Sequence, residues 1–104
     1  MLIYAIEVSK TASAGAWSFN TLKFDSAILK QIILKAASTD TGFDFQLIDE
    51  RSNNVIDTTV SGDAATGTYN RQLEIPLKGI YTVKVLNSSA NEAFTGRLLI
   101  QEEA

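Results

Sequence analysis

The sequence predicts an all-β protein, an antiparallel β-sandwich of jelly-roll type with about eight strands. Apolar and polar residues alternate in twos along one segment after another, which is typical of half-buried strands. Turn-forming residues separate these segments at intervals of roughly 10 to 15 residues, a spacing that favours a two-layer sandwich. The chain has 104 residues, enough for one core and too few for two, so we expect a single domain over residues 1–104.

The first expected strand is LIYAIEVS, residues 2–9, in which the even positions are apolar and Glu7 and Ser9 share the other face. The next is AWSFNTLKF, residues 16–24. In it Trp17 and Phe19 fall on one face while Leu22 and Phe24 fall on the other. We therefore expect a bulge or a twist within this segment.

Residues 26–38, SAILKQIILKAAS, fit two structures. As a helix, the segment has apolar residues at helical spacing and Asp25 or Ser26 as a cap. As a strand, it places Ile28, Ile32, Leu34 and Ala36 on one face, interrupted by Lys30. Its isoleucines and the strands expected on both sides favour the strand.

The middle of the chain is predicted to form a hairpin, GFDFQLIDE (42–50) followed by VIDTTV (55–60), with RSNN as the turn and with Phe43, Phe45 and Leu47 facing inward. Residues 61–67, SGDAATG, have the composition of a surface loop. The strand TYNRQLEIPL (68–77) should face inward with its odd apolar positions, with Arg71 near the rim.

Pro76 belongs at an edge or a strand end, because proline cannot donate a hydrogen bond to a sheet. Gly79 then allows the chain to reverse into the strand IYTVKVL, residues 80–86, and we expect the strands on either side of this corner to form one antiparallel pair within a sheet. After the loop NSSANE, the last expected strand is AFTGRLLIQ, residues 93–101. In these two strands the following residues should point inward: Tyr81, Val83, Val85, Phe94, Leu98 and Ile100.

Composition excludes several classes of function. The chain has no cysteine and no histidine, so disulfide scaffolds, cysteine chemistry, Ser-His-Asp triads and imidazole ligands for zinc are all ruled out. Its net charge is −3 and its basic residues are scattered, which argues against nucleic-acid binding. The N-terminus MLIYAIEVSK matches neither a signal peptide nor a membrane span, so we expect a protein made in the cytoplasm and not secreted.

The acidic residues are the remaining candidates for chemistry. Loop carboxylates can bind calcium, but the spacing Asp-x-Asp-x-Asp-Gly is missing, so we favour ordinary solvated acids. Asp49 and Glu50 resemble a glycosidase pair only in being two acids, since neighbours on a strand point to opposite faces. We therefore expect no catalytic site, no cofactor and no enzymatic activity. The acids considered for calcium are Asp40, Asp44, Asp49, Glu50, Asp57 and Asp63.

Three aromatic residues, Trp17, Tyr69 and Tyr81, suggest a platform for a sugar. The alternative, which we favour, is that they pack in the core, as aromatic residues on strands commonly do. Arg51 and Arg97 have no motif around them and are expected at the surface.

The C-terminal half resembles the closing strands of pre-peptidase C-terminal β-sandwich modules. The resemblance covers about half of the chain and implies a fold, because the matching positions are turn and core residues. They lie in FDFQLIDERSNNVI (Leu47, Asp49, Ile56), in GIYTVKVLNSS (Gly79, Tyr81, Val83, Val85) and in the final strand (Leu98, Ile100, and more loosely Phe94).

The chain as a whole, with its segments LKQIILKAAS, FDFQLID and EIPLKGIYTVKVLNSS, resembles small virion structural proteins of tailed bacteriophages, including capsid decoration (cement) proteins. The resemblance implies assembly in the host cytoplasm, a place in the virion, many copies per particle and no catalysis. It implies as partners the major capsid protein or another virion protein, with a homo-oligomer, a trimer favoured, and neither nucleic acid nor membrane.

Edge strands suit such a role, because an unpaired edge can accept a strand from a neighbour. We expect the strand from Leu2 to Val8 and the C-terminal tail QEEA to act as arms that reach a partner. The alternatives are a tail, neck or fibre-base component of the virion, or a carbohydrate-binding module of the same fold.

Overall fold

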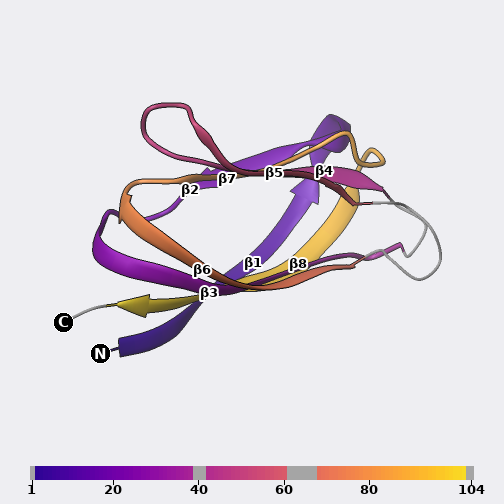
Figure 1. Cartoon of the computed structure of the whole chain (residues 1–104). Helices are drawn as coiled ribbons and strands as arrows, with labels where there is room; N and C mark the ends of the chain where they lie inside the picture. Colours follow the sequence, from indigo (N-terminus) through magenta and orange to yellow (C-terminus); the bar gives the residue numbers. More distant parts are fainter. Residues whose placement is uncertain (1, 39–41, 61–67, 103–104) are drawn as a thin grey trace.

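The computed structural model describes residues 2–38, 42–60 and 68–102. Within them the strands form two antiparallel sheets packed face to face (Figure 1). The first sheet contains, in spatial order, β1 (Leu2–Ala12), β8 (Glu92–Glu102), β3 (Phe24–Ala36) and β6 (Thr68–Gly79). The second sheet contains β2 (Trp17–Asn20), β7 (Thr82–Leu86), β4 (Phe43–Ile48) and β5 (Asn54–Val60). A short 3-10 turn, η1 (Ser13–Gly15), connects β1 to β2.

The order of the strands gives a jelly roll. Except for the hairpin β4–β5, each described strand is followed in the chain by a strand of the other sheet. In space the first sheet has the order β1-β8-β3-β6 and the second β2-β7-β4-β5, which is the interleaved pattern of two Greek keys. The predicted fold class is therefore confirmed. None of the described residues forms a helix with the length and apolar character that crossing a membrane would take.

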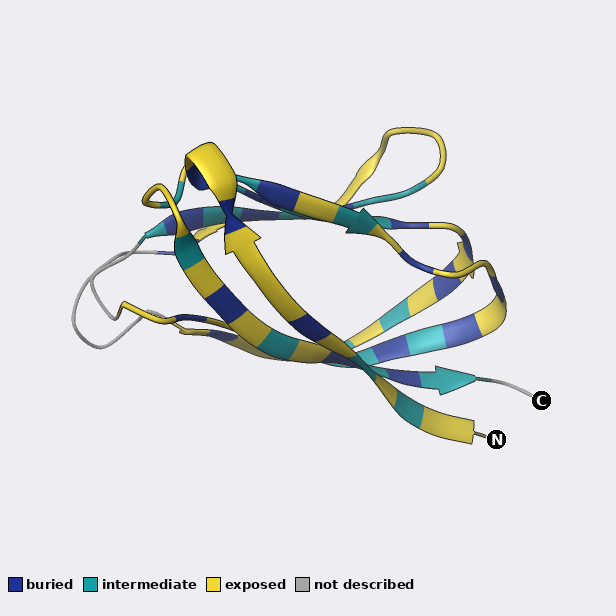
Figure 2. Cartoon of the chain, turned by 180° about the vertical axis from the view of Figure 1, so that it is seen from behind, coloured by how far each residue is buried: buried dark blue, intermediate teal, exposed yellow. Residues whose placement is uncertain are grey.

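The core lies between the two sheets and is built from alternate residues of each strand. Buried and exposed bands follow one another along the strands in Figure 2, as the alternation in the sequence predicts. A hollow of only about 10 Å³ remains near Phe24 and Leu98, so the core is filled. Its largest fully buried side chains are Phe24, Phe43, Phe45, Phe94, Leu29, Ile32, Leu34, Leu47, Leu98, Ile100, Val83 and Val85.

Residues 26–36 lie in strand β3, as we favoured over a helix, but the predicted inward face was wrong for the first part of the segment. Ala27 and Leu29 are buried before position 30, whereas Ile32, Leu34 and Ala36 are buried after it. The register with β8 shifts between Leu29 and Gln31, so Lys30 is an extra residue in β3. This β-bulge moves the inward face from odd to even positions, and Ile28 consequently lies on the outer face.

Residues 16–24 were predicted as a single bulged strand, and this was wrong. β2 ends at Asn20, Leu22 lies in the connection with 86% of its surface exposed, and Phe24 begins β3. The change of face therefore comes from a change of strand and of sheet. The C-terminal tail QEEA was also predicted to act as an arm that reaches a partner, but its residues Gln101 and Glu102 belong to β8 and pair with β1 and β3, while residues 103–104 lie outside the described residues. The predicted loop at 61–67 lies outside the described residues.

The position of the corner after Pro76 was predicted correctly, but the expected antiparallel pair was wrong, because β6 and β7 lie in different sheets. β6 is an outer strand, where proline is tolerated, and Gly79 adopts a φ of 90° as the chain leaves it. Buried Thr21 fastens the corner to the end of β2. Its N–H donates to the Tyr81 carbonyl oxygen (2.8 Å), and its Oγ1 accepts from the Tyr81 N–H (3.0 Å).

Candidate interaction surface

The outer strands of the two sheets differ in how well they are protected from pairing with another chain. β6 carries Pro76 and an irregularity opposite Lys30, where Leu73 and Glu74 face one residue of β3. Lys30 forms an ion pair with Glu74 across this irregularity. Proline, bulges and charges are all devices that discourage strand addition. In the second sheet, β2 and β5 are short, with 4 and 7 residues.

β1 has neither a proline nor a bulge, and its charged residues, Glu7 and Lys10, both lie beyond residue 6. It has 11 residues and pairs with β8 from Leu2 to Ala12 without a register shift. On its other flank, no described strand pairs with it. Residues 2–6 carry no charge, and Leu2 and Ile3 have 58% and 55% of their surface exposed. The edge of β1 is therefore long, and its N-terminal half is an apolar surface that another strand can extend.

A groove of about 320 Å³ runs beside β1, between the edges of the two sheets. Its apolar lining comes from Tyr4 and Ile6 of β1, Phe19 of β2, and Leu22 and Phe24 beyond it. Figure 2 shows this side of the molecule, with β1 crossing the front. An added strand would place alternate side chains over the groove, which is how strand addition gains specificity.

Two interactions stiffen the walls of this groove. The Tyr4 hydroxyl donates to Glu102 Oε1 on β8 (3.3 Å), and burial together with this carboxylate raises the pKa of Tyr4. Lys10 Nζ lies 5.2 Å from the centre of the Phe19 ring, within the range of a cation–π contact. Lys10 therefore bridges β1 and β2 at one end of the groove.

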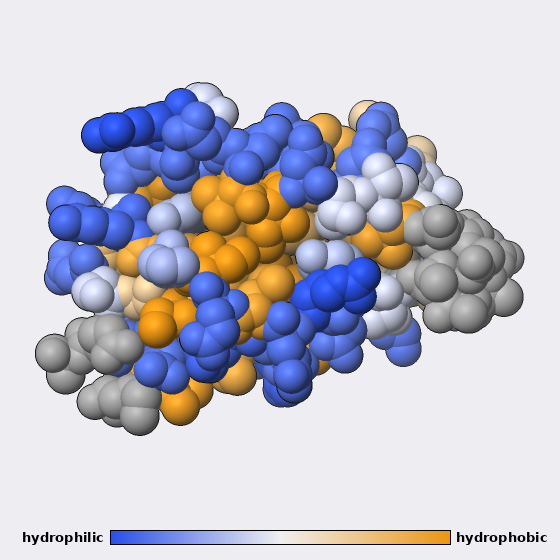
Figure 3. All heavy atoms as spheres, viewed as in Figure 1, coloured by the Kyte–Doolittle hydropathy of each residue, from blue (hydrophilic) through white to orange (hydrophobic). Residues whose placement is uncertain are grey.

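The side of the sandwich formed by β5 and β6 is also partly apolar. Ile56, Leu73 and Ile75 are half-buried there against the core. Figure 3 shows hydrophobic atoms gathered between the two sheets on this side. The Tyr69 ring closes one end, with the guanidinium of Arg71 5.3 Å from its centre, and burial raises the pKa of Tyr69 although the Arg71 charge opposes this. Arg71 thus lies at the rim, as predicted.

The acids considered for calcium do not converge. Asp44 accepts hydrogen bonds from Asn87 Nδ2 (2.7 Å) and Thr59 Oγ1 (2.8 Å), and these hydrogen bonds, that from Asn87 first, lower its pKa. Asp57 accepts from Gln46 and Asn54. Asp40 and Asp63 lie outside the described residues. Among those that are described, no group of acidic side chains is placed to hold a metal ion.

Asp49 and Glu50 lie in the β4–β5 turn and not on a strand, so the reason we gave for rejecting them as a pair was wrong. Asp49 Oδ1 accepts the N–H groups of Arg51 and Asn53, both at 2.9 Å, and the Asn53 hydrogen bond is the main cause that lowers its pKa. Glu50 Oε1 accepts the Ile80 N–H (2.9 Å) from the β6–β7 corner. Each carboxylate thus holds a backbone segment in place.

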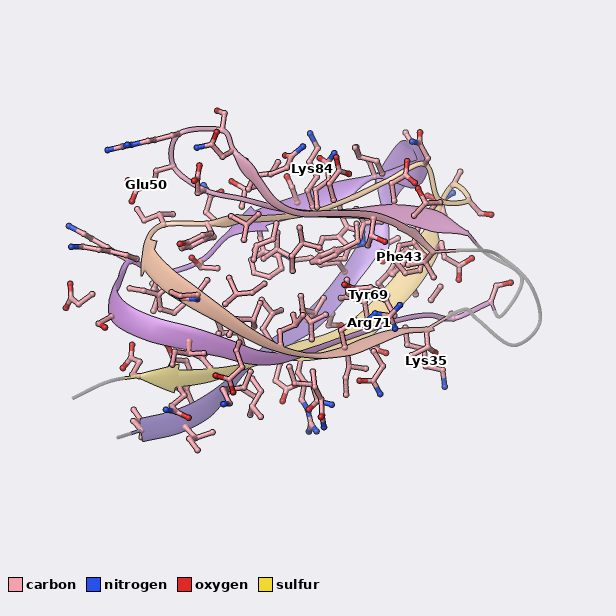
Figure 4. All side chains as sticks on the ribbon, viewed as in Figure 1. Lys35, Phe43, Glu50, Tyr69, Arg71 and Lys84 are labelled. Atoms are coloured by element: carbon pink, nitrogen blue, oxygen red, sulfur yellow. The ribbon has the colours of Figure 1, made fainter. Side chains whose placement is uncertain are left out.

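Trp17, Tyr69 and Tyr81 are all buried, with at most 8% of their surface exposed. The Trp17 ring packs against Phe19 and Phe94, at centroid distances of 6.0 and 5.8 Å. Tyr69 and Phe43 point into the space between the sheets in Figure 4, whereas Lys35 and Lys84 point outward. The structure therefore confirms core packing for these three aromatic residues and excludes them as a flat platform for a sugar.

Arg51 in the β4–β5 turn and Arg97 on β8, opposite Glu7, are both exposed, as predicted. A hollow of about 730 Å³ lies at this end of the sandwich, with Lys23, Asp25, Arg51 and Lys78 on its walls. Its charges are mixed in sign, so it favours neither an anion nor a cation.

Sequence reasoning found the β1 edge but missed the groove beside it. The groove depends on Leu22, which was assigned to a strand face, and on the proximity of β1 and β2 at the sheet edges. The sequence does hold one signal that Leu22 lies outside a strand. It stands between the polar residues Thr21 and Lys23, where the alternation that predicts β2 has already ended.

No protein-family model matches this chain, and no curated protein sequence matches it. Among solved structures, the chain is similar to the infectious bursal disease virus VP2 subviral particle, with 16% identity over 98% of this chain and a TM-score of 0.42. It is also similar to the structure of the infectious bursal disease virus Gx strain (16% identity, 95% of this chain, TM-score 0.37). A family two carbohydrate esterase from Cellvibrio japonicus gives 10% identity, 97% coverage and a TM-score of 0.37. This chain spans 33%, 31% and 35% of the length of those three chains, and none is similar enough to bear on its function.

Proposed function

We propose that the protein is a non-enzymatic structural component of the virion of a tailed bacteriophage, and most specifically a capsid decoration protein. The observation that carries the proposal is the β1 edge, a long strand with an apolar N-terminal half and a flank that no described strand pairs with. Such an edge is suited to continuation by another chain, which is what an assembly protein requires. The resemblance of the sequence to small virion proteins supports the same role.

On a shell, many copies act together. Each contact along an edge strand can be modest, because repetition on a symmetric surface turns single binding events into a multivalent one. We propose the major capsid protein or another virion protein as the partner. A trimer at three-fold or quasi-three-fold positions is the favoured arrangement of the copies, and the virion is the expected location.

The placement of the acids supports a role without catalysis. Asp44, Asp49 and Glu50 each accept hydrogen bonds that tie neighbouring segments together. A general acid or base needs a pKa near the working pH, yet the hydrogen bonds to Asp44 and Asp49 move their pKa values downward, away from it. Their arrangement suits a rigid scaffold.

The test is co-sedimentation with empty shells assembled from the major capsid protein of the same genome. We expect the protein to sediment with the shells, to saturate at a fixed number of copies, and to raise the temperature at which the shells disassemble. A protein that stays in the supernatant and leaves the shell unchanged would contradict the proposal. A glycan array run in parallel checks the alternative, because selective sugar binding without shell binding would favour a carbohydrate-binding module.

A further inference from the structure

The edge of β1 is apolar on both faces only in its N-terminal half. There Leu2, Tyr4 and Ile6 face inward, and Ile3 and Ala5 lie on the outer face. A strand that pairs with this half must therefore be uncharged and apolar on both faces, or it would place polar groups against apolar ones.

In the described chain, residues 2–6 themselves meet this requirement. Leu2 and Ile3 are among its most exposed large hydrophobic side chains, and Leu22, the most exposed, lies in the groove beside them. Exposed apolar surface that is gathered on one side of a small protein marks an interaction site. The N-terminal half of β1 in a second copy of the protein therefore meets the requirement for pairing with the β1 edge.

The charges on β1 select the register of such a pair. If two β1 strands paired antiparallel over their full length, Leu2 would lie opposite Ala12 and the midpoint would be Glu7. Two Glu7 side chains would then lie directly opposite each other on one face, which is destabilising. A pair centred on Tyr4 avoids this, because only the uncharged residues 2–6 are then paired.

We infer that the N-terminal half of β1 pairs antiparallel with the same half of a second copy, around a two-fold axis at Tyr4. Leu2 of one copy then lies beside Ile6 of the other, where it reaches the groove formed with Phe19 and Leu22. Ile3 lies beside Ala5 on the outer face. The two sandwiches share one continuous sheet, and the exposed apolar groups of both copies are buried together.

This pair uses the same edge as the proposed function and deepens it, because it identifies the chain that continues β1 as a second copy. A three-fold ring requires two different surfaces, whereas a two-fold pair uses the same surface twice. On a shell, the β1 contact would therefore join copies that belong to neighbouring trimers. Shell binding without pairing, or pairing without shell binding, would separate the two proposals.

The absence of cysteine from the chain allows a sharp test, in which single cysteines are introduced into the full-length protein. If the two-fold axis passes through residue 4, Tyr4→Cys places the introduced cysteines of the two copies directly opposite each other, with their Cβ atoms about 4.5–5.5 Å apart. We expect mild oxidation to convert Tyr4→Cys to a disulfide-linked dimer at least about 10-fold faster than Ser9→Cys, which lies on the same strand outside the paired half. Glu7→Cys reports the full-length register and should also react slowly.

A second measurement does not depend on changing Tyr4. Sedimentation equilibrium should show the wild-type mass rising with concentration toward that of a pair, or of pairs of trimers. Ile3→Lys should weaken this association at least about 10-fold, since it places a charge opposite Ala5. Val55→Lys, at an exposed apolar position on β5, is the matched control and should leave the association unchanged. Equal cross-linking of Ser9→Cys or Glu7→Cys, or association that Ile3→Lys leaves unchanged, would overturn the inference.

Discussion

The carboxylate of Glu50 occupies the space that a side chain at Gly79 would need. A Cβ atom built on Gly79 would lie 1.8 Å from Glu50 Oε1, which accepts the N–H of Ile80 at 2.9 Å. The β4–β5 turn and the β6–β7 corner are thus joined through a carboxylate that fits only against glycine. Figure 4 shows Glu50 at this turn.

Replacing this glycine should weaken the corner. Gly79→Ala combines a positive φ, which costs a non-glycine residue about 1–3 kcal/mol, with loss of the Glu50 hydrogen bond, worth about 1 kcal/mol. Urea denaturation should show the free energy of unfolding falling by about that sum. Glu50→Ala alone should cost about 1 kcal/mol. Because the double variant loses the hydrogen bond only once, it should be less destabilised than the two single variants added together; strict additivity would contradict this contact.

Trp17 tests whether the aromatic residues are structural. Trp17→Ala should destabilise the protein by about 3–5 kcal/mol, the range for a large aromatic side chain removed from a core. Trp17 Nε1 is buried without an acceptor among the described atoms, so Trp17→Phe removes an unsatisfied donor and should cost about 1 kcal/mol or less. Thermal unfolding of both variants checks this order. A Trp17→Ala protein that keeps full stability would show that the ring is not part of the core.

The bulge at Lys30 makes an unusual prediction about deletions in β3. Removing Lys30 leaves Leu29 inward, Gln31 outward and Ile32 inward, so each remaining side chain keeps its face. Removing Ile33 instead inverts every inward position on one side of the deletion. Circular dichroism should therefore show a folded protein without Lys30 and an unfolded one without Ile33. The lost ion pair with Glu74 is surface-exposed, so it should cost at most about 1 kcal/mol.

Acid should destabilise the β4–β5 turn and the Asp44 contacts. Hydrogen bonds lower the pKa values of Asp49 and Asp44 below the ordinary 3.8, so both groups stabilise the fold above that pH. This contribution is lost as the pH falls through the lowered values. The urea midpoint of the wild type should therefore decline below about pH 4, and that of Asp49→Ala should start lower and decline less. Parallel declines in the two proteins would show that Asp49 does not contribute.

The strands with unbroken alternation could be predicted from the sequence. β4, β7 and β8 point the expected residues inward, Phe43, Phe45, Val83, Val85 and Leu98 among them. One face of each of these strands packs against the core, so the burial of its apolar residues determines which face points inward. For the same reason the jelly roll itself followed from the number and spacing of the strands.

The errors have physical causes that a single strand does not reveal. The shift of face in β3 comes from one extra residue relative to β8, and only the pairing makes it visible. Leu22 was misplaced because the chain changes sheet between Asn20 and Phe24. The groove beside β1 could not be predicted, because it arises where the edges of two sheets meet and no local pattern describes that meeting.

Cryo-electron microscopy of the empty shell, imaged with and without the purified protein, tests the assembly role most directly. The proposed role predicts added density on the outside of the shell, repeated at three-fold or quasi-three-fold positions and matching a two-layer β body. Shells whose surfaces are identical in the two samples, at protein concentrations that saturate all sites, would contradict it.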